Sequence, residues 1–224
     1  MSDSGRAPDP PDSPVSTSAV GIPPTRLYMV RHAQSEWNRE RRIQGQADPP
    51  LSERGLEQAA RLAATLGQRS WAGFYTSDLA RARQTSEALE AGAGCHPEPL
   101  PALREVALGE WEGLTAPELE ARFPAEWAAW RREPDWDLAP GGEGGQSFES
   151  RVASVVDEIL ARHPTGNVLV VTHGGVIQVS LGRILGRGSR GAFPFRISNA
   201  SVTLLERTGP GLTIGGVNLT GGIP

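Results

Sequence analysis

Hydrophobic and polar residues follow two different periods along this chain, and the two periods alternate. Short apolar runs that stop at polar residues predict buried strands at 26–31, 71–76 and 167–172, with a short strand at 97–100. Apolar positions spaced by three or four residues predict helices at 52–66, 79–91, 116–132, 147–162 and 176–185. Two final strands, which are candidates for a hairpin, are expected at 200–206 and 212–218. Strands that alternate with helices predict an α/β fold, a three-layer αβα sandwich with a mainly parallel sheet.

Local signals mark where several of these elements begin and end. The hydroxyl of Ser52 can cap the first helix, and Gly67 is expected to end that helix as a C-terminal glycine. Pro124 interrupts the helical pattern of 116–132. The Pro- and Gly-rich stretch 134–145 predicts a loop before the long helix.

Composition separates the start of the chain from the rest. Residues 1–25 are rich in Pro, Ser, Asp and Gly and contain almost no large apolar side chains, so we predict a disordered tail. Residues 26–224 then form a single domain, since we see no internal repeat and no second boundary. The tail lacks the basic start and apolar stretch of a secretory signal. Cys95 is the only cysteine, which excludes disulfides and favours a reducing compartment, so we expect a cytoplasmic protein.

Charge narrows the classes of partner. The formal net charge of -4, from 22 basic and 26 acidic residues, gives no basic footprint for nucleic acid or an anionic membrane. No apolar run reaches the roughly 18 residues that a membrane span needs. Every basic residue is Arg, and the absence of Lys excludes Schiff-base enzymes and the lysine of Walker-A phosphate loops. A phosphate site in this chain therefore has to use Arg side chains or backbone amides.

Polar residues follow two of the predicted strands at the point where each strand ends. His32 comes directly after the first strand, beside Arg31, and His173 follows the strand 167–172 ahead of Gly174. Ligands of such sheets bind at the carboxyl ends of the strands, so these side chains are expected to converge. Two histidines and an arginine at one sheet edge, next to the start of a helix, indicate a phosphate site.

Two further side chains are expected near the same edge. Arg81 falls in the first turn of the helix that follows the second strand, and Glu105 precedes a Gly-Glu-Trp-Glu-Gly turn. Each candidate taken alone has an ordinary structural explanation, such as a strand-end hydrogen bond for a histidine or a surface ion pair for an arginine. His96 and His163 lack any such context and are predicted to be structural. Only the combination indicates chemistry.

Five segments carry a family resemblance, and they occur in a fixed order. They are VRHAQSEWN at 30–38, RIQGQADPPLS at 42–52, TSDLARARQT at 76–85, LRE at 103–105 with WEG at 111–113, and VTHGG at 171–175. Together they resemble the signature of the histidine phosphatase superfamily, the phosphoglycerate-mutase-like proteins. The ordered set covers residues 27–201. The resemblance implies a mainly parallel sheet flanked by helices, in agreement with the hydrophobic pattern.

The resemblance also implies roles for individual residues. His32 would attack the phosphorus of a phosphomonoester and form a phosphohistidine, while Arg31, Arg81 and His173 surround the transferring group. Glu105 would protonate the leaving oxygen and then activate the water that cleaves the intermediate. The residues implied to bind the substrate are Ser35, Asn38, Gln44, Gly45 and Gly174. Neither a metal ion nor another cofactor is implied.

The chain departs from the family pattern at three places. Ala33 stands where glycine is usual, and Gln34 stands where an acidic residue is usual. Neither change removes a catalytic group. The Gly-rich run 140–147 is similar to the family's Pro-Gly-Gly-Glu-Ser loop with extra residues before Ser147, so the path of this loop stays open.

The choice between hydrolysis and phosphoryl retention depends on the segment after the acidic residue. Only 140 − 105 = 35 positions separate Glu105 from Pro140, which is short for the covering insertion of a mutase. The segments 111–115 and 123–124 resemble the phosphatase branch. We therefore expect a metal-independent phosphatase. A cofactor-dependent phosphoglycerate mutase is the alternative, and a phospho-ligand-binding protein without catalysis and a metal hydrolase are weaker rivals.

The expected partner is a small phosphorylated metabolite, and its identity stays open. Phosphoglycerates, sugar phosphates and α-ribazole phosphate all fit. Trp127, Trp130 and Trp136 are predicted to pack a small helical cap onto the sheet, with an apolar rim around the substrate as the alternative. Monomer and homodimer both stay open.

Overall fold

One mixed sheet organises the protein. The computed structural model describes residues 24–67, 69–188, 194–207, 209 and 211–224, so the disorder predicted for residues 1–23 lies outside the described part. The sheet order is β3-β2-β4-β1-β5-β6. The strands are β1 (Thr25–Arg31), β2 (Gly73–Thr76), β3 (Glu98–Pro99), β4 (Gly166–Thr172), β5 (Val202–Arg207) and β6 (Leu212–Leu219). The first four pair in parallel and β5 is antiparallel to both neighbours, which confirms a mainly parallel sheet that ends in an antiparallel pair.

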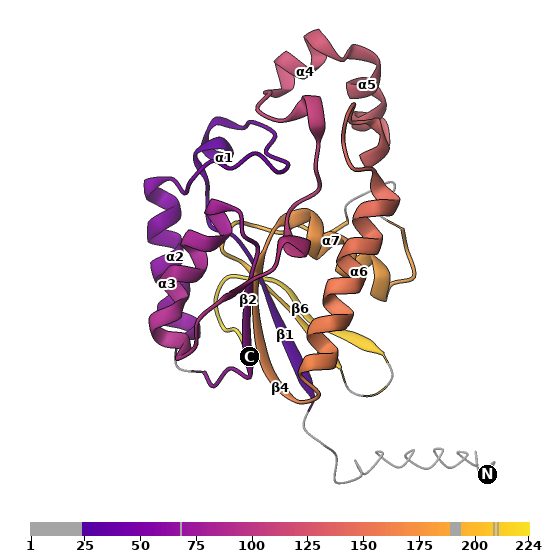
Figure 1. The fold of residues 1–224 in the computed structure, drawn as a ribbon. Helices are drawn as coiled ribbons and strands as arrows, with labels where there is room; N and C mark the ends of the chain where they lie inside the picture. The colour runs from indigo at the N-terminus through magenta and orange to yellow at the C-terminus, as the bar shows by residue number, and fades with distance from the viewer. Residues whose placement is uncertain (1–23, 68, 189–193, 208, 210) are drawn as a thin grey trace, which may run out of the picture.

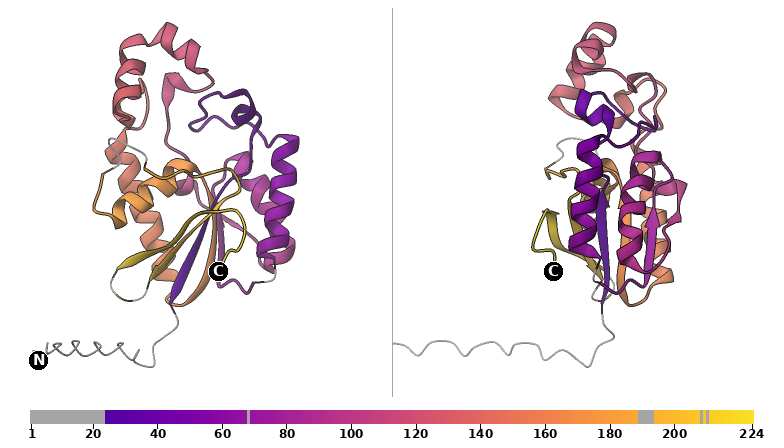
Figure 2. Two further views of the ribbon diagram at one scale, coloured as in Figure 1. Left: turned by 180° about the vertical axis from the view of Figure 1, so that it is seen from behind. Right: turned by 90° about the vertical axis from the view of Figure 1, so that its left-hand side faces the viewer.

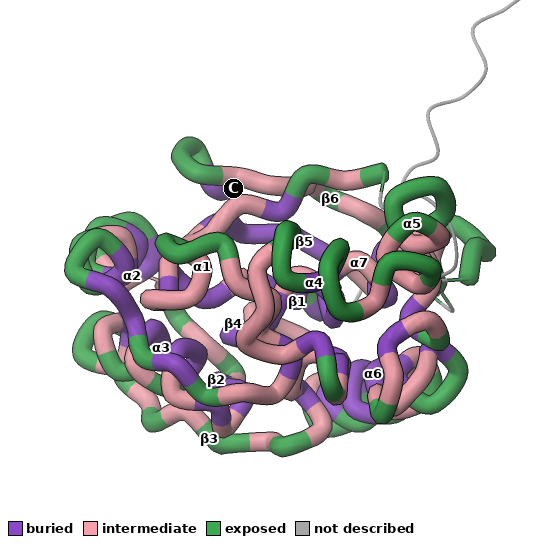
Figure 3. Tube along the Cα trace, turned by 90° about the horizontal axis from the view of Figure 1, so that it is seen from above, coloured by how far each residue is buried: buried purple, intermediate pink, exposed green. Residues whose placement is uncertain are grey.

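Helices cover both faces of this sheet, as the predicted three-layer sandwich requires (Figure 1). α2 (Glu53–Leu66) and α3 (Ala80–Ala93) pack together on one face, whereas α6 (Gly145–Arg162) and α7 (Gly174–Ile184) lie on the other. The view from above separates the two pairs of helices (Figure 3). Three shorter helices lie beyond the end of the sheet at which β1 and β4 stop, and Figure 2 shows the same arrangement from two other sides. They are α1 (Glu36–Glu40), α4 (Ala116–Arg122) and α5 (Pro124–Arg132).

Alternate residues of the central strands build two separate cores. On β1, Leu27 and Met29 join the cluster under α6 and α7, whereas Tyr28 and Val30 join the cluster under α2 and α3. β4 alternates in the same way. Because both faces of these strands are buried, their sequences are continuous apolar runs, the pattern typical of a covered parallel sheet. The central strands are therefore fixed from both sides, which makes their ends firm supports for a site.

The glycine that ends α2 has a different role from the one predicted. Ser52 caps this helix as expected, with its Oγ accepting from the Gly55 amide at 3.1 Å. Gly67 is the C-terminal cap, but its φ of -67° is right-handed and needs no glycine. A Cβ at Gly67 would lie 2.7 Å from the Ala63 oxygen and 3.2 Å from the Cα of Gly92. The glycine therefore permits the close approach of α2 and α3.

Several predicted boundaries shift by a few residues. The strand predicted from Trp71 begins at Gly73, and the long helix begins at Gly145, two residues before the predicted start. β1 begins at Thr25, the last residue of the predicted tail, because its buried hydroxyl donates to the His163 carbonyl at 2.7 Å. The pattern at 116–132 forms two helices that meet at Pro124, as the break predicted. Within the described ranges, no helix is both long and apolar enough to cross a bilayer.

Four tryptophans join the crossover between β3 and α6 to the core. Trp111 is buried, and Trp127 and Trp130 of α5 meet its ring edge-on, at centroid distances of 5.9 and 5.5 Å. Trp136 follows in a short 3₁₀ turn, and the centroid of its ring lies 5.1 Å from that of Trp130. This contact chain confirms that the tryptophans pack a helical cap. It also fixes the position of α5 above the sheet edge.

Candidate active site

The ends of β1 and β4 bring two histidines together. The strands pair in register up to Arg31 and Thr172, and the His32 amide extends the ladder by donating to the Thr172 carbonyl at 2.8 Å. The rings of His32 and His173 are therefore close, with centroids 5.1 Å apart. Both side chains are buried. The expected convergence at the carboxyl edge of the sheet is confirmed.

The surroundings of His32 determine its tautomer and its charge. Its Nδ1 lies 2.7 Å from the carbonyl oxygen of Ala33. A carbonyl can only accept, so Nδ1 carries the ring proton and Nε2 is left with a free lone pair. Burial lowers the pKa of His32 well below its ordinary value, and the charges of Arg81 and Arg31 lower it further. At neutral pH the ring is neutral.

His173 is equally buried, but it stands behind the cavity wall. Its Nε2 lies 2.8 Å from the Ser77 hydroxyl, whereas its Nδ1 has no hydrogen-bond partner among the described residues. Burial lowers the pKa of His173 well below its ordinary value, and the charge of Arg81 lowers it further. His173 is absent from the residues that line the cavity.

Arg31, which is half-buried, and Arg81, which is buried, bring two positive charges that no carboxylate among the described residues pairs with. Arg31 Nη1 donates to the Ile197 carbonyl at 2.5 Å, and the Nη atoms of Arg81 donate to the Gly45 and Ala47 carbonyls, both at 2.7 Å. The Nε atoms of both arginines have no partner within the described residues. Burial lowers both pKa values, that of Arg81 to about 10, so both stay cationic at neutral pH. Cations that are shielded from water and bonded only to neutral carbonyls are prepared to receive an anion.

Glu105 reaches the cavity from the crossover between β3 and α6. Its two oxygens accept from the Val106 amide at 3.1 Å and from the Gly175 amide, in the first turn of α7, at 3.0 Å. A Cβ at Gly175 would lie 2.2 Å from Glu105 Oε1, so only glycine allows this approach. At Gly174 a Cβ would make ordinary contact with Arg31, at 3.5 Å. The sequence singled out Gly174, which lines the cavity, but the close approach occurs at Gly175.

The loop that follows α1 holds Arg81 through its carbonyls and is itself held by Glu112. The Glu112 carboxylate accepts from the amides of Gln46, Ala47 and Leu108, at 2.9, 2.8 and 2.9 Å. Gly45 has a φ of +52°, and a Cβ there would lie 2.1 Å from Glu112 Oε1. Glu112 thus joins the Arg81-binding loop to the crossover that carries Glu105. The sequence analysis missed this role, although the residue lies in the WEG motif.

Ser35 and Asn38 lie behind the cavity wall. They form the capping box of α1, in which Ser35 Oγ accepts from the Asn38 amide and Asn38 Oδ1 accepts from the Ser35 amide, at 3.1 and 3.2 Å. Ser35 also donates to Gln44 Oε1 at 2.6 Å, and Asn38 accepts from Asn199 at 3.1 Å. Of the residues implied to bind substrate, the described structure therefore places Gln44, Gly45 and Gly174 in the wall and these two outside it.

Arg151 and Glu143 form a clamp that holds the backbone on both sides of Glu105. The Arg151 guanidinium donates to the carbonyls of Ala102, Arg104 and Glu105, at 2.9, 2.8 and 3.2 Å. It also pairs with Glu143, which in turn accepts from the Ala107 amide at 2.9 Å. Glu143 belongs to the Gly-rich run whose path the sequence left open. That run therefore passes beside the Glu105 segment, and neither Arg151 nor this use of Glu143 was predicted.

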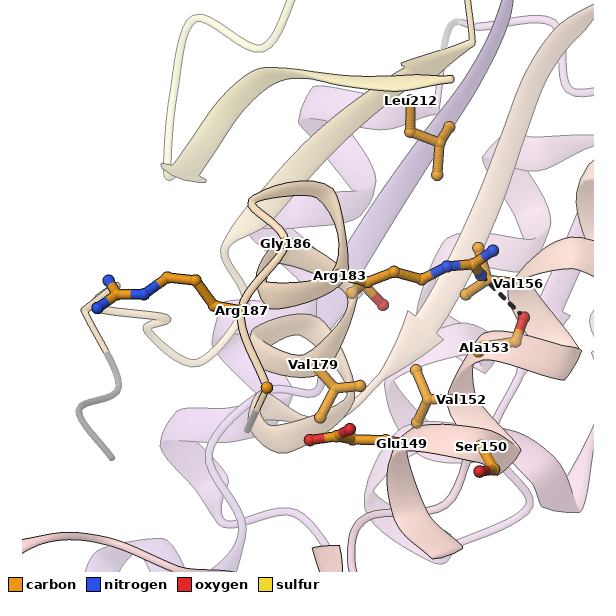
Figure 4. Close-up of a pocket in the computed structure, with 12 residues that line it drawn as sticks. Glu149, Ser150, Val152, Ala153, Val156, Val179, Arg183, Gly186, Arg187 and Leu212 are labelled. Atoms are coloured by element: carbon orange, nitrogen blue, oxygen red, sulfur yellow. Dashed lines mark hydrogen bonds between the residues drawn. The ribbon is translucent and has the colours of Figure 1, made fainter. Parts of the chain in front are cut away.

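Two of the cavities that the described residues line have a volume of about 420 Å³ each, and one of these two contains this chemistry. The first lies at the strand ends, and its lining includes Arg31, His32, Arg81 and Glu105. The second lies between α6 and α7, where Val152, Val156 and Val179 face a largely apolar hollow (Figure 4). Its Arg183 is already bonded to Asp157 and to the Ala153 carbonyl. The candidate active site is the cavity at the strand ends. In the described ranges no three His, Cys, Asp or Glu side chains are grouped to hold a metal ion.

Comparison with known proteins gives the family. The family described as histidine phosphatase superfamily (branch 1) matches residues 27–220. A Cronobacter sakazakii protein named "Probable phosphoglycerate mutase GpmB" is 33% identical over 203 residues, which cover 88% of this chain and 92% of that protein. Glucosyl-3-phosphoglycerate phosphatase of Mycobacterium tuberculosis is 38% identical over 161 residues, 68% of this chain and 71% of that protein. The crystal structure of the α-ribazole phosphatase of Shigella flexneri superposes with a TM-score of 0.77 at 26% identity, covering 89% of this chain and 99% of the other.

The chain belongs to the histidine phosphatase superfamily, branch 1, and is an enzyme of that superfamily. Its resemblance to the family, stated above from five motifs, is confirmed.

Proposed function

We propose that this superfamily member is a metal-independent phosphomonoester hydrolase that acts on a small phosphorylated metabolite through a phosphohistidine at His32. The observation that carries the proposal is the state of the His32 ring. Its Nδ1–H is committed to the Ala33 carbonyl and its pKa is held well below the ordinary value, so Nε2 keeps its lone pair at neutral pH. A neutral imidazole nitrogen beside two arginines that pair with no carboxylate among the described residues is a nucleophile for a phosphate ester.

In the first step the lone pair of His32 Nε2 attacks phosphorus, and the bond from phosphorus to the ester oxygen breaks. Arg31 and Arg81 stabilise the charge on the phosphoryl oxygens, because their Nε donors are buried and otherwise unpaired. Glu105, in its acid form, gives its proton to the leaving oxygen. The products of this step are the free alcohol, the phosphohistidine and the Glu105 carboxylate.

In the second step water attacks phosphorus and the nitrogen–phosphorus bond breaks. The Glu105 carboxylate accepts a proton from the attacking water, so the acid form is restored. His32 recovers its neutral tautomer, because the Ala33 carbonyl keeps the proton on Nδ1 throughout. The step releases inorganic phosphate, and the enzyme returns to its starting state.

The test is a His32→Ala variant, with His96→Ala as the matched control because that side chain is 93% exposed and far from the chemistry. Turnover of p-nitrophenyl phosphate with a chelator present should fall by about 10³-fold or more in His32→Ala and stay unchanged in the control. A phosphoenzyme that survives alkali and is lost in acid should form only when His32 is present. Full activity in a folded His32→Ala protein would falsify the nucleophile assignment.

The second candidate is phosphoglycerate mutase activity, which the similarity to the Cronobacter protein favours. The catalytic groups serve either reaction, so product analysis decides between the two. Incubation with 3-phosphoglycerate should release phosphate without forming 2-phosphoglycerate if the enzyme is a hydrolase. Interconversion without release of phosphate establishes the mutase instead.

A further inference from the structure

We propose that Ser77 is a positioning residue of the phosphoryl-transfer site. Its hydroxyl fixes the ring of His173 in one tautomer, so that His173 offers an Nδ1–H donor, and no lone pair, to the phosphoryl group that His32 carries. The proposal rests on the phosphatase function proposed above and deepens it, because it gives His173 a task in both reaction steps. It is carried by the hydrogen bonds of two fully buried side chains, Ser77 and His173.

Three adjacent strand ends place Ser77, His173 and His32 in a row. β4 lies between β2 and β1 in the sheet. Ser77 extends the parallel pairing of β2 with β4, because its amide donates to the Val171 carbonyl at 2.9 Å. On the side of β1, the ring centroid of His32 lies 5.1 Å from that of His173. Ser77 therefore reaches His173 from the strand on the other side of β4 from the one that carries the nucleophile.

The hydrogen bonds of Ser77 decide which nitrogen of His173 carries the ring proton. Its Oγ accepts from the Leu79 amide at 3.3 Å and lies 2.8 Å from Nε2 of His173. Among the described residues, Nε2 is the one acceptor that this hydroxyl contacts, so the single Ser77 proton is donated there. Burial keeps the ring neutral, and its own proton is then on Nδ1.

The opposite tautomer leaves more buried groups without a partner. With the proton on Nε2, the Ser77 hydroxyl would accept twice, and its own proton would find no acceptor among the described residues. The lone pair on Nδ1 of His173 would find no donor there either. In the tautomer that Ser77 selects, Nδ1–H alone stays unpaired. Unpaired buried polar groups are costly, so the first arrangement is favoured.

The remaining Nδ1–H of His173 is a donor without an acceptor in the described part of the chain. The two nitrogens of an imidazole point in nearly opposite directions, so this donor points away from Ser77. Arg81 and Arg31 are the cations that act on the ring, and a guanidinium cannot accept its proton. An oxygen of the phosphoryl group on His32 is the acceptor that completes the bond. The opposite tautomer would repel this oxygen with a lone pair.

An ordinary structural role of Ser77 predicts different results. The bond from the Leu79 amide closes a turn before α3, and a hydroxyl that served this turn alone would affect only stability. Ser86 provides the matched control, because it is as fully buried as Ser77 and its hydroxyl donates within α3, to the Ala82 carbonyl at 3.0 Å. Ser86→Ala removes the same atom without touching His173.

The first experiment determines the tautomer and needs no activity. Long-range ¹H–¹⁵N spectra of the full chain, labelled with ¹⁵N-histidine, distinguish a protonated ring nitrogen from one with a lone pair, and His173→Asn identifies the signals of His173. We expect a protonated Nδ1 and an unprotonated Nε2, both in the native chain and in Ser86→Ala. In Ser77→Ala the Nε2 signal should shift, because it loses its hydrogen bond. A protonated Nε2 in the native chain would overturn the proposal.

The second experiment measures the consequence for the phosphate. Ser77→Ala should lower kcat/KM for p-nitrophenyl phosphate by about tenfold and raise the inhibition constant of inorganic phosphate by a similar factor. Ser77→Thr keeps a hydroxyl and should recover most of both losses. Ser86→Ala should change neither constant by more than about twofold, even where its melting temperature falls equally. Equal effects of Ser77→Ala and Ser86→Ala would reduce Ser77 to a structural role.

The third experiment moves the donor. An asparagine amide can place an N–H where His173 has Nδ1, whereas a glutamine amide reaches the position of Nε2. His173→Asn should therefore keep about tenfold more kcat/KM than His173→Gln. In the His173→Asn background, Ser77→Ala should have almost no further effect, because no ring nitrogen is left to orient. Higher activity of His173→Gln, or fully additive losses, would contradict the assignment.

These outcomes separate the proposal from the function on which it rests. A native chain that hydrolyses no phosphomonoester would refute the phosphatase function. The tautomer of His173 and the binding of inorganic phosphate would still decide the role of Ser77 in that case, because neither measurement needs turnover.

Discussion

The sheet delivers Arg31 and His32 to the cavity at the end of β1, whereas the crossover between β3 and α6 delivers Glu105 and Trp130. The first pair is held by strand pairing on both sides, because β1 lies between β4 and β5. The crossover pairs with a neighbour only through the single antiparallel bridge between Arg42 and Thr115 among the described residues, and it is built mainly of short helices and 3₁₀ turns. The same cavity therefore has a phosphate end supported by the sheet and a leaving-group end supported by side chains.

Two half-buried carboxylates supply the support that the crossover lacks. Glu112 binds three amides and joins the Arg81-binding loop to the start of the crossover, and Glu143 works with Arg151 on the other side of Glu105. The position of the acidic residue thus depends on side chains far from it in sequence. The two ends of the cavity should therefore respond differently to substitution. Replacing the side chains that hold the crossover should impair the leaving-group end more than the phosphate end.

The largest effect that separates the two ends is expected at Glu105. Glu105→Gln keeps the shape of the side chain but cannot give a proton, so esters with poor leaving groups should slow by about 10²- to 10⁴-fold. p-Nitrophenyl phosphate needs no proton on its leaving oxygen, so the rate of its phosphorylation step should fall far less. The measurement is kcat/KM over a series of leaving groups.

Glu110→Gln is the control for this substitution, because Glu110 is exposed and only five positions away in the crossover. The Glu110→Gln variant should leave kcat/KM unchanged for every leaving group in the series. Equal losses on activated and unactivated esters in Glu105→Gln would contradict the acid role and leave Glu105 as a positioning residue.

A smaller effect is expected when the clamp around Glu105 is removed. The double variant Arg151→Met, Glu143→Gln removes both charges together, which avoids leaving one of them buried and unpaired. We expect kcat for poor leaving groups to fall by about 10- to 100-fold, because Glu105 loses its alignment with the leaving oxygen. The loss for p-nitrophenyl phosphate should be several times smaller.

Arg151→Lys gives the check on this interpretation. A lysine keeps the positive charge beside Glu143 but cannot hold three carbonyls with a planar fork, so it should restore stability better than rate. Parallel loss of rate for every leaving group, in step with a lower melting temperature, would show that the clamp serves folding alone.

The sequence predicted the convergence of His32 and His173 well because strand ends are visible in a single chain. Apolar runs stop at Arg31 and His173, and the topology of an α/β sheet brings such stops to one edge. The fold class followed from the same runs. Boundaries were less certain where a residue is held by tertiary contacts, as Thr25 is by the His163 carbonyl.

The leaving-group end could not be predicted to the same depth. Arg151 is one of two arginines on α6, and only its contacts with a segment 46 to 49 positions away show what it does. Trp127 and Trp130 are three positions apart on α5, with similar contacts to Trp111, yet only Trp130 lines the cavity. Differences of this kind depend on the angle at which a helix packs, which a sequence pattern does not specify.

The smallest effect concerns the stability of the phosphate end. Burial and the nearby arginines hold the pKa values of His32 and His173 well below their ordinary value of about 6.5. Below that pH the unfolded chain binds protons that the folded one does not, so stability falls as pH falls. Each histidine contributes a slope of about 1.4 kcal/mol per pH unit, down to its lowered folded pKa. Above about pH 7.5 neither contributes to the pH dependence.

Urea unfolding at pH 7.5, 6.5 and 5.5 measures this slope. In the double variant His32→Gln, His173→Gln, the free energy of unfolding should depend less on pH than in the native chain, by up to about 2.7 kcal/mol per pH unit. The reason is that glutamine does not titrate. If the double variant kept the native slope, the two buried rings would not be the neutral pair on which the phosphate end depends. That result would also remove the reason for His32 to act as a nucleophile at neutral pH.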